Sequence, residues 1–382
     1  MDEHKINMLS DKIVKGTISE KEMEEFNEWY GTYDNLEQTV TADKSQEALA
    51  ERIFKNITTE ANLHIPKSRN IKIWPRIAVA ASFALVVGLS LFYYTGKQAN
   101  KARETAYLKN IKPGGNGAVL TLADGRKIRL DAATKGELAN EAGVRITKTK
   151  DGQILYETKA VASAKDKINT LSTANGETYS ITLPDHTVVY LNAASSISYP
   201  ASFATLNERK VELSGEAYFE VAKDSSHPFI VRTADQEIKV LGTHFNVNSY
   251  KDDGNTKTTL LEGSVQIGFS SNKNETGTII KPGEQAYIKA NRIYIDQVKA
   301  EDAIAWKNGY FRFNNETLAQ AMNKIARWYN VKIEYKDQSI KNKNVYGSLS
   351  RFSNIADVLN LLELTEAVEF EIEGNKIIVL KK

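Results

Sequence analysis

One dipeptide in this sequence carries the functional groups for a reaction of its own backbone. Thr243 places a hydroxyl directly after the carbonyl of Gly242, in a segment with many strand-forming residues. Such a hydroxyl can attack the preceding carbonyl if the peptide is held strained, which moves the acyl group from nitrogen to oxygen. Gly242 and Thr243 are therefore a candidate self-cleavage site, and a glycine bulge in a strand is the simpler alternative.

The other residues that could catalyse a reaction or bind a metal are scattered. The histidines occur singly, at His4, His64, His186, His227 and His244, and the sequence has no cysteine. It has no glycine-rich phosphate loop, no Gly-x-Ser-x-Gly elbow and no His-Glu-x-x-His motif. We therefore predict no catalytic residue, no cofactor and no metal site, and a protein that is not a conventional enzyme.

One apolar segment divides the sequence into two unequal parts. Residues 77–94 carry no charge. As a helix they would span about 27 Å, close to the bilayer hydrocarbon core of about 30 Å. We expect one transmembrane helix here, and a buried core helix is the alternative. Its direction is open, because residues 62–76 and 95–109 each carry four lysines or arginines.

Residues 1–66 are predicted to form a short helical domain of net charge −7, from seven basic and fourteen acidic side chains. Ser19 and Glu22 match a capping box at the start of a helix. Three apolar stripes follow helical spacing: Ile6, Leu9 and Ile13; Met23, Phe26, Trp29 and Tyr30; and Leu49, Ile53, Phe54 and Ile57. The stripes can pack against one another. So small a domain buries little apolar surface, however, and a partner protein could cover the apolar faces that remain exposed.

Strand signals begin after the lysine-rich residues 95–116, which are typical of a linker. Residues 117–170 contain two alternating runs around Asp-Gly turns and are predicted to be a β-hairpin region. From 171 to 300 short strands alternate with turn residues, which is typical of an all-β domain such as a sandwich, a barrel or a short β-helix.

The pattern changes again over residues 301–382. Residues 316–329 place Leu318, Met322, Ile325 and Trp328 on one helical face. Strand signals surround this helix and a second one near 354–364, in the order βαβ-βαββ, a small α+β domain. The predicted fold class is thus a multidomain chain with an N-terminal helical domain, one transmembrane helix, an all-β domain and a C-terminal α+β domain.

Six strings resemble, in the same order, the periplasmic domain of FecR-family transmembrane anti-sigma factors. They are LPDHTVVYLNAASSISYP from Leu183, GEAYFEVA from Gly215, PF from Pro228, VLGTHFNV from Val240, LEGSV from Leu261 and KPGEQA from Lys281. The string RWYNV from Arg327 resembles the C-terminal domain of such regulators, which is similar to the STN domain of secretins and transporters. Phe26 and Trp29 resemble the cytoplasmic domain more loosely. His186 departs from the family, which commonly has glycine there.

The resemblance implies a single-pass protein of the bacterial inner membrane, with a cytoplasmic N-terminus and a periplasmic C-terminus. It implies contact with the N-terminal signalling domain of a TonB-dependent outer-membrane transporter. It also implies control of an extracytoplasmic-function sigma factor and of the transcription of nutrient-uptake genes, without direct binding to nucleic acid. Regulatory proteases are further partners compatible with such a system, and some members of the family resemble proteins that are cleaved at a Gly-Thr bond in this motif.

The acidic N-terminal domain fits a sigma factor as partner, because its charge could attract and mask a basic DNA-binding surface. Our candidate contacts are the apolar residues Leu9, Ile13, Phe26 and Trp29 together with Glu22, and Glu24, Glu25 and Glu28 would steer the encounter. The same glutamates could instead merely solvate a helix face.

Two other functions are compatible with parts of the sequence. One is a membrane-anchored scaffold whose STN-like domain docks in an envelope complex, although a scaffold does not need the acidic helical domain. The other is an anchored glycan-binding or hydrolytic domain, which we disfavour because the sequence reveals no carboxylate pair and no aromatic platform.

Overall fold

The computed structural model describes residues 3–14, 17–31 and 111–382, apart from 132–134, 142–143, 150–153, 159–165, 272–276, 291 and 365–366. Two compact units make up the chain, one of Met1–Phe26 with Glu104–Lys382 and the other of Asn27–Arg103. The described residues belong almost entirely to the first unit.

The predicted fold class is wrong in its transmembrane helix. The described part of the chain is mostly strand and has five α-helices, none of them long and apolar enough to cross a membrane. The longest have 12 residues, or about 18 Å, well short of a bilayer core of about 30 Å. The segment 77–94 lies outside the described residues, as do the third apolar stripe and most of the predicted linker.

Two helices form the described N-terminal part, α1 (Glu3–Val14) and α2 (Glu20–Gly31). The predicted capping box of α2 is confirmed, since the Ser19 amide donates to the Glu22 carboxylate at 3.1 Å and the Glu22 amide donates to the Ser19 hydroxyl at 3.4 Å. Ion pairs of Lys5 with Glu25 and of Lys12 with Glu22 join the two helices.

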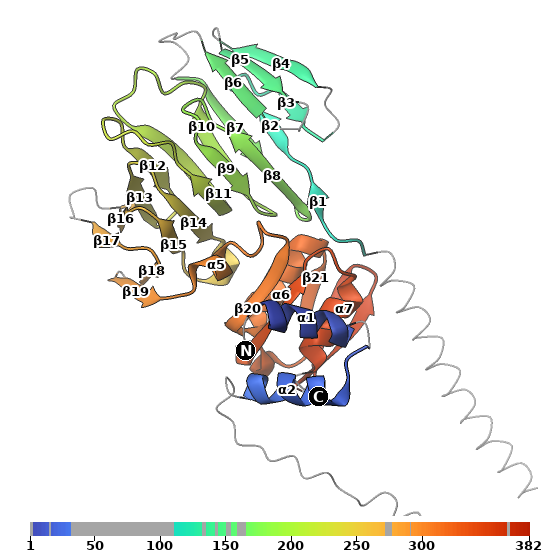
Figure 1. The fold of residues 1–382 in the computed structure, drawn as a ribbon. Coiled ribbons are helices and arrows are strands. Elements are labelled where there is room, and N and C mark those ends of the chain that lie inside the picture. Colours follow the sequence, from blue (N-terminus) through green and yellow to red (C-terminus); the bar gives the residue numbers. More distant parts are fainter. Residues whose placement is uncertain are drawn as a thin grey trace, which may run out of the picture. The chain divides into compact units, whose positions relative to one another are not determined.

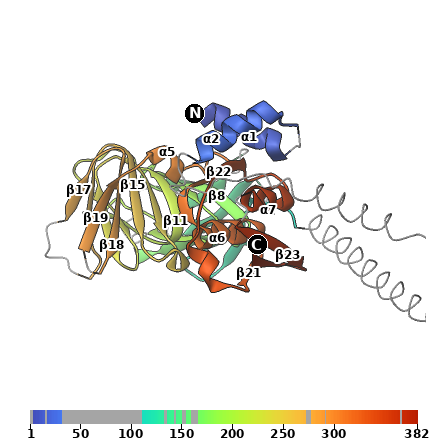
Figure 2. The same ribbon diagram turned by 90° about the horizontal axis from the view of Figure 1, so that it is seen from below.

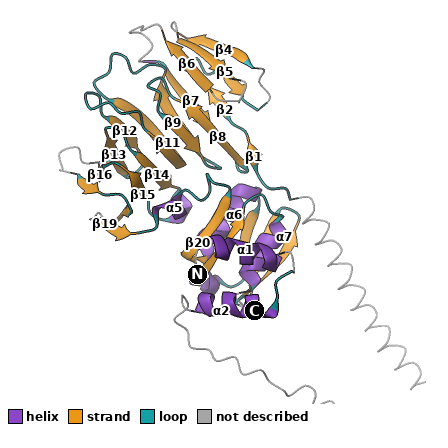
Figure 3. Ribbon diagram, in the orientation of Figure 1, coloured by secondary structure: helices purple, strands orange, loops and turns teal. Residues whose placement is uncertain are grey.

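The β domain, residues 111–297, is a pair of facing sheets that share one strand (Figures 1 and 3). The shared strand is β11 (Arg209–Glu220). The first sheet has the order β17-β16-β13-β12-β11-β10-β7-β2-β3. The second has the order β19-β18-β15-β14-β11-β9-β8-β6-β5-β4. The short β1 (Gly115–Asn116) pairs with β8.

The remaining strands are short. Those of the first sheet are β2 (Val119–Thr121), β3 (Lys127–Arg129), β7 (Ile168–Ser172), β10 (Ser196–Pro200), β12 (Phe229–Arg232), β13 (Gln236–Val240), β16 (Val265–Phe269) and β17 (Thr278–Ile280). Those of the second are β4 (Gly136–Glu141), β5 (Val144–Lys148), β6 (Ile154–Thr158), β8 (Glu177–Thr182), β9 (Val188–Leu191), β14 (His244–Ser249), β15 (Lys257–Glu262), β18 (Glu284–Lys289) and β19 (Arg292–Gln297). The strands of the predicted hairpin region, 117–170, therefore belong to these same two sheets.

A glycine lets β11 pass from one sheet to the other. Up to Ser214 the strand pairs with β10, and from Gly215 onward it pairs with β14. Gly215 has φ +90°, a conformation that favours glycine. A Cβ there would lie 2.7 Å from the Ser195 Cα, so the close approach of the two chains also requires glycine.

Alternation along the strands separates the core from the outer faces. In the second half of β11 the side chains of Ala217 and Phe219 are fully buried in the core between the sheets. Glu216 and Tyr218 alternate with them and therefore lie on the outer face of the second sheet. Phe219 stacks on Phe245 of β14, with ring centroids 5.1 Å apart.

The C-terminal domain follows the short helix α5 (Ala300–Ala303) and spans residues 310–382 (Figure 2). Its elements are β20 (Tyr310–Thr317), α6 (Leu318–Tyr329), β21 (Lys332–Tyr335), β22 (Asn344–Ser350), α7 (Ile355–Glu363), β23 (Val368–Glu373) and β24 (Lys376–Lys381). This order is βαβ-βαββ, but the strands form two separate sheets, β20-β22 and β21-β24-β23. A capping box of Thr317 and Gln320 starts α6, and Asn330 ends it in the left-handed conformation.

Candidate functional site

The β domain and the C-terminal domain meet at a polar seam on the outer face of the second sheet. At its centre Glu216 is 7% exposed although it projects from the outer face of β11. Asn192 and Asn246, on the flanking chain segments, each donate an amide hydrogen to one oxygen of the Glu216 carboxylate, at 2.7 and 3.0 Å. Both carboxylate oxygens are therefore held by the β domain itself.

The same two asparagines connect Glu216 to residues that follow the β domain. The Oδ1 atom of Asn246 accepts from the Trp306 indole at 3.2 Å, and that of Asn192 accepts from the Arg351 guanidinium at 3.2 Å. Because each amide oxygen is occupied in this way, each amide nitrogen must face Glu216. We call these five residues the Glu216 network.

Burial raises the pKa of Glu216, and the hydrogen bonds from Asn246 and Asn192 oppose the rise. Burial lowers the pKa of Arg351 to about 10. Its guanidinium lies 3.4 Å from the centroid of the Trp328 ring and donates to the Trp306 carbonyl at 2.8 Å. The network thus holds a buried acid and a buried base between two domains.

A second contact across the seam is made by Arg327 of α6. Its guanidinium donates to Asp252 at 2.9 Å and to Asp253 at 2.8 Å, both in the short helix η2 (Lys251–Asp253) of the β domain. It also lies 3.8 Å from the centroid of the Tyr250 ring. The Arg327 carbonyl accepts from the amide of Gly176 at 2.7 Å. Arg327 therefore clamps α6 to two separate loops of the β domain.

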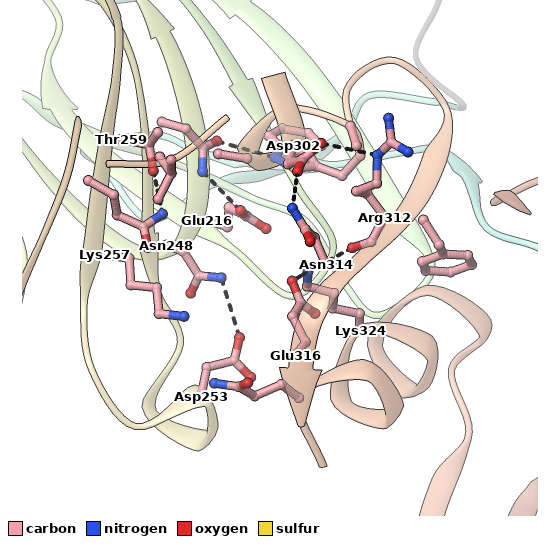
Figure 4. A pocket seen from close by; sticks show the side chains of 18 of the residues that line it. Glu216, Asn248, Asp253, Lys257, Thr259, Asp302, Arg312, Asn314, Glu316 and Lys324 are labelled. Atoms are coloured by element: carbon pink, nitrogen blue, oxygen red, sulfur yellow. Dashed lines mark hydrogen bonds and ion pairs between the residues drawn. The ribbon is translucent and has the colours of Figure 1, made fainter. Parts of the chain in front are cut away.

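A cavity of about 790 Å³ opens beside these contacts (Figure 4). Glu216, Asn248 and Thr259 line it from the β domain, and Asn314, Glu316 and Lys324 line it from the C-terminal domain. Burial lowers the pKa of Lys324, but the carboxylates of Glu316, Glu216 and Asp253 together outweigh this, so the pKa is raised. Within the described residues no group of His, Cys, Asp or Glu could hold a metal ion.

The predicted self-cleavage residues are not among the residues that line the cavity; they lie where β13 of the first sheet leads into β14 of the second. Gly242 has φ +149°, and a Cβ there would lie 2.8 Å from the Lys223 Cα, so this position requires glycine. The Thr243 side chain is 3% exposed, and its hydroxyl donates to the Ser264 carbonyl at 3.0 Å. Whether the bond is cleaved stays a prediction.

The predicted sigma-factor contacts divide into buried and exposed residues. Leu9 and Phe26 are buried, at 0% and 5% exposed. Ile13 and Glu22 are half-buried, and Lys12 lowers the pKa of Glu22 to about 2. Trp29 lies in α2, but its side chain is outside the described part of the structure. Glu24, Glu25 and Glu28 are exposed on α2.

Sequence reasoning did not single out the Glu216 network or the Arg327 clamp. The signal was nevertheless present, because Asn192, Glu216, Asn246 and Arg327 all fall within strings that carry the family resemblance. The strings are far apart in sequence, and only the fold brings these four polar residues to one seam.

Comparisons with known proteins agree with this architecture. The model of the FecR protein family matches residues 169–266, and the model of the FecR C-terminal domain matches residues 310–379. No curated protein matches the sequence. Two crystal structures of a candidate anti-sigma factor from Parabacteroides distasonis ATCC 8503, at 2.50 and 1.65 Å resolution, are each 31% identical to this chain. Each comparison has a TM-score of 0.52 and covers 56% of this chain and 99% of the other. The chain therefore belongs to the FecR family of anti-sigma regulators.

Proposed function

We propose that this regulator relays a signal from a TonB-dependent outer-membrane transporter to an extracytoplasmic-function sigma factor, and so controls the transcription of nutrient-uptake genes. In this proposal the β domain and the C-terminal domain receive the signal, and the N-terminal helices bind the sigma factor. The location at the bacterial inner membrane stays a prediction, as does the likeness of the C-terminal domain to STN domains.

The observation that carries the proposal is the polar seam. Two domains that served only as a rigid spacer could pack through apolar side chains, which bury surface at no electrostatic cost. Here the contact instead depends on a buried carboxylate and two buried guanidinium groups. Such contacts have strict geometry, so a partner that binds the C-terminal domain can shift the seam between discrete arrangements.

The exposed acidic face of α2 supports the sigma-factor half of the proposal. Glu24 and Glu28 are exposed and carry no ion pair within the described residues. They are therefore available to attract a basic surface, whereas Leu9 and Phe26 are buried and would contact a partner only after a rearrangement. The charged contacts should appear mainly in the association rate.

Capture of the sigma factor tests this half. The tagged full-length chain is immobilised, extracytoplasmic-function sigma factors of the same organism are passed over it, and capture and association rate are measured. The double variant Glu24→Lys, Glu28→Lys should slow association by about tenfold. Glu371→Lys, an exposed reversal on β23, is the matched control and should leave association unchanged. Equal association by the double variant, or no capture by the wild type, would contradict the proposal.

We further propose that Gly242-Thr243 is a self-cleavage site. The Thr243 hydroxyl attacks the Gly242 carbonyl, the hydroxyl proton passes to the departing amide nitrogen, and an ester replaces the peptide bond. Water then hydrolyses the ester, which leaves a Gly242 carboxylate and a Thr243 amine as the new termini. The required glycine conformation and the buried hydroxyl support this, because both hold the two groups in a fixed geometry.

Mass spectrometry of the full-length chain tests the cleavage. A fragment beginning at Thr243 should form in the wild type and in Thr243→Ser, which keeps the hydroxyl, and should be missing in Thr243→Ala. Intact chains in all three preparations would refute self-cleavage and leave the regulatory role untouched.

A further inference from the structure

The proposed function, in which a signal passes between proteins, gives no role to the cavity beside the seam. Its volume of about 790 Å³ lies within the range of small-molecule sites, about 300–1,000 Å³. It is formed by both domains, and its walls come from the strands of the second sheet and from β20 and α6. A molecule bound there would contact both domains at once.

Many uncharged hydrogen-bonding groups line the cavity beside its charged residues. Five asparagines and three glutamines line it. Each amide offers two donor hydrogens and one acceptor oxygen, the combination that complements a hydroxyl group. Asn248 and Gln285 are outside the Glu216 network. The Asn248 amide nitrogen donates to Asp253 at 3.3 Å and its oxygen accepts from the Tyr250 amide at 3.3 Å, whereas the Gln285 amide nitrogen donates to Thr259 at 2.7 Å. They keep capacity for a further hydrogen bond.

The charges of the lining nearly cancel. Six lysines and arginines face five aspartates and glutamates. Three of the basic groups are already paired with acidic groups of the same lining, namely Arg327 with Asp253, Lys324 with Glu316, and Arg312 with Asp302. An anion such as a phosphate or a ferric carboxylate chelate would need an excess of unpaired basic groups. The lining therefore fits an uncharged ligand better.

Two tryptophans complete the lining. Trp306 is half-buried in the wall, whereas Trp328 is 2% exposed and is covered by Arg351. The Trp306 N–H already donates to Asn246, so its ring face is the part that can pack against apolar C–H groups of a ligand. An aromatic surface next to many amides suits a molecule with both hydroxyl groups and C–H faces.

We propose that this cavity binds a neutral, hydroxyl-rich small molecule of the oligosaccharide class. The ligand bridges the β domain and the C-terminal domain and stabilises their contact. No residue of α1 or α2, which carry the proposed sigma-factor contacts, is among the residues that line this cavity. The regulator would thus respond directly to this small molecule, in addition to any protein partner.

Tryptophan fluorescence and titration calorimetry test the proposal on the full-length chain, since two of its four tryptophans line the cavity. The probes are maltotriose, cellotriose, xylotriose and mannotriose, with citrate and inorganic phosphate as anionic comparisons. At least one trisaccharide should bind with a dissociation constant below about 1 mM. The double variant Asn248→Ala, Gln285→Ala should weaken that binding at least about tenfold.

Two further variants distinguish a loss of binding from a loss of folding. Gln285→Glu preserves shape but replaces two donor hydrogens with a charge, and should also weaken trisaccharide binding about tenfold. Asn375→Ala removes an exposed amide in the turn between β23 and β24 and should leave binding unchanged. No binding of any trisaccharide at about 10 mM, tighter binding of citrate or phosphate, or unchanged binding by Gln285→Glu would overturn the proposal. None of these outcomes depends on capture of the sigma factor.

Discussion

At the scale of single residues, His186 occupies a backbone conformation that favours glycine. Its φ is +69°, and its side chain is exposed, while the neighbouring Asp185 and Thr187 bond to each other at 2.7 Å. A side chain in the left-handed region costs the folded state about 1–2 kcal/mol, which glycine avoids. Glycine in turn lowers stability by about 0.4–1 kcal/mol, because the unfolded chain has more conformational entropy to lose.

We therefore expect His186→Gly to raise the free energy of unfolding by about 0.5–1 kcal/mol, measured by urea denaturation. His186→Ala keeps the unfavourable conformation and should leave stability close to that of the wild type. If the alanine variant were as stable as the glycine variant, the backbone of this turn would not limit stability.

Glu216 should make stability depend on pH. Its pKa is raised by burial above the ordinary 4.5, so the folded state favours the protonated form. The stability that protonation contributes is fully present below pH 4.5 and is lost as the pH rises through the raised pKa of the folded state. A single group contributes a slope of at most about 1.4 kcal/mol per pH unit.

The prediction is tested by urea unfolding of the wild type and Glu216→Gln from pH 4.5 to 8. The wild type should lose stability relative to Glu216→Gln as the pH rises through this window. Glu212→Gln changes an exposed carboxylate on the same strand and should run parallel to the wild type. A constant difference between the wild type and Glu216→Gln would mean that Glu216 titrates normally.

At the scale of elements, the start of α6 depends on its capping box. The Thr317 hydroxyl accepts from the Gln320 amide at 3.3 Å, and the Gln320 side chain accepts from the Thr317 amide at 3.1 Å. Thr317→Ala should lower the free energy of unfolding by about 1 kcal/mol, because an amide at the helix start loses its partner. Thr317→Ser keeps the hydroxyl and should restore most of the loss in the same denaturation experiment. An equal loss in both variants would point to packing of the threonine methyl instead.

Much of α6 could be predicted from the sequence, because its signals are local. Its apolar residues recur at helical spacing, and the structure buries Leu318, Met322, Ile325 and Trp328 together. The division of the surrounding strands into two sheets could not be predicted, since strand partners are chosen by tertiary packing. For the same reason the sequence could not show that the hairpin region joins the sheets of the all-β domain.

The candidate site also could not be predicted from the sequence, because it too depends on tertiary packing. Alternation along β11 places Glu216 opposite Ala217 and Phe219, which predicts a solvent-facing carboxylate. It is buried because a second domain covers that face, and no local pattern in β11 carries this information. The helical spacing of Arg327 likewise gives no sign of Asp252 and Asp253, about 75 positions earlier in the sequence.

At the scale of the whole molecule, the Arg327 clamp should make the β domain and the C-terminal domain unfold together. Arg327 is 9% exposed and Asp253 is its buried partner. Removing one member of a buried ion pair leaves the other uncompensated and costs about 3–5 kcal/mol. Arg327→Ala should therefore split a single calorimetric unfolding transition into two, or lower its midpoint sharply.

Asp252→Ala is the control within the same clamp. The Asp252 side chain is 58% exposed, so its pair with Arg327 should contribute less than about 1 kcal/mol. This variant should unfold in one calorimetric transition, with a midpoint temperature close to that of the wild type. If both variants behaved alike, the two domains would be joined by contacts other than the buried half of the clamp.

The long strand β11 has a mechanical consequence. One continuous backbone runs through both sheets, so the two layers cannot be peeled apart while its ladders with β10, β12, β9 and β14 remain intact. The Glu216 network ties this same strand to the C-terminal domain. Tension applied to that domain would pull on β11 through Glu216, and the hydrogen bonds that β11 makes with strands on both sides would resist the pull together. The strand that receives a force from the C-terminal domain is thus the one that is hydrogen-bonded within both sheets.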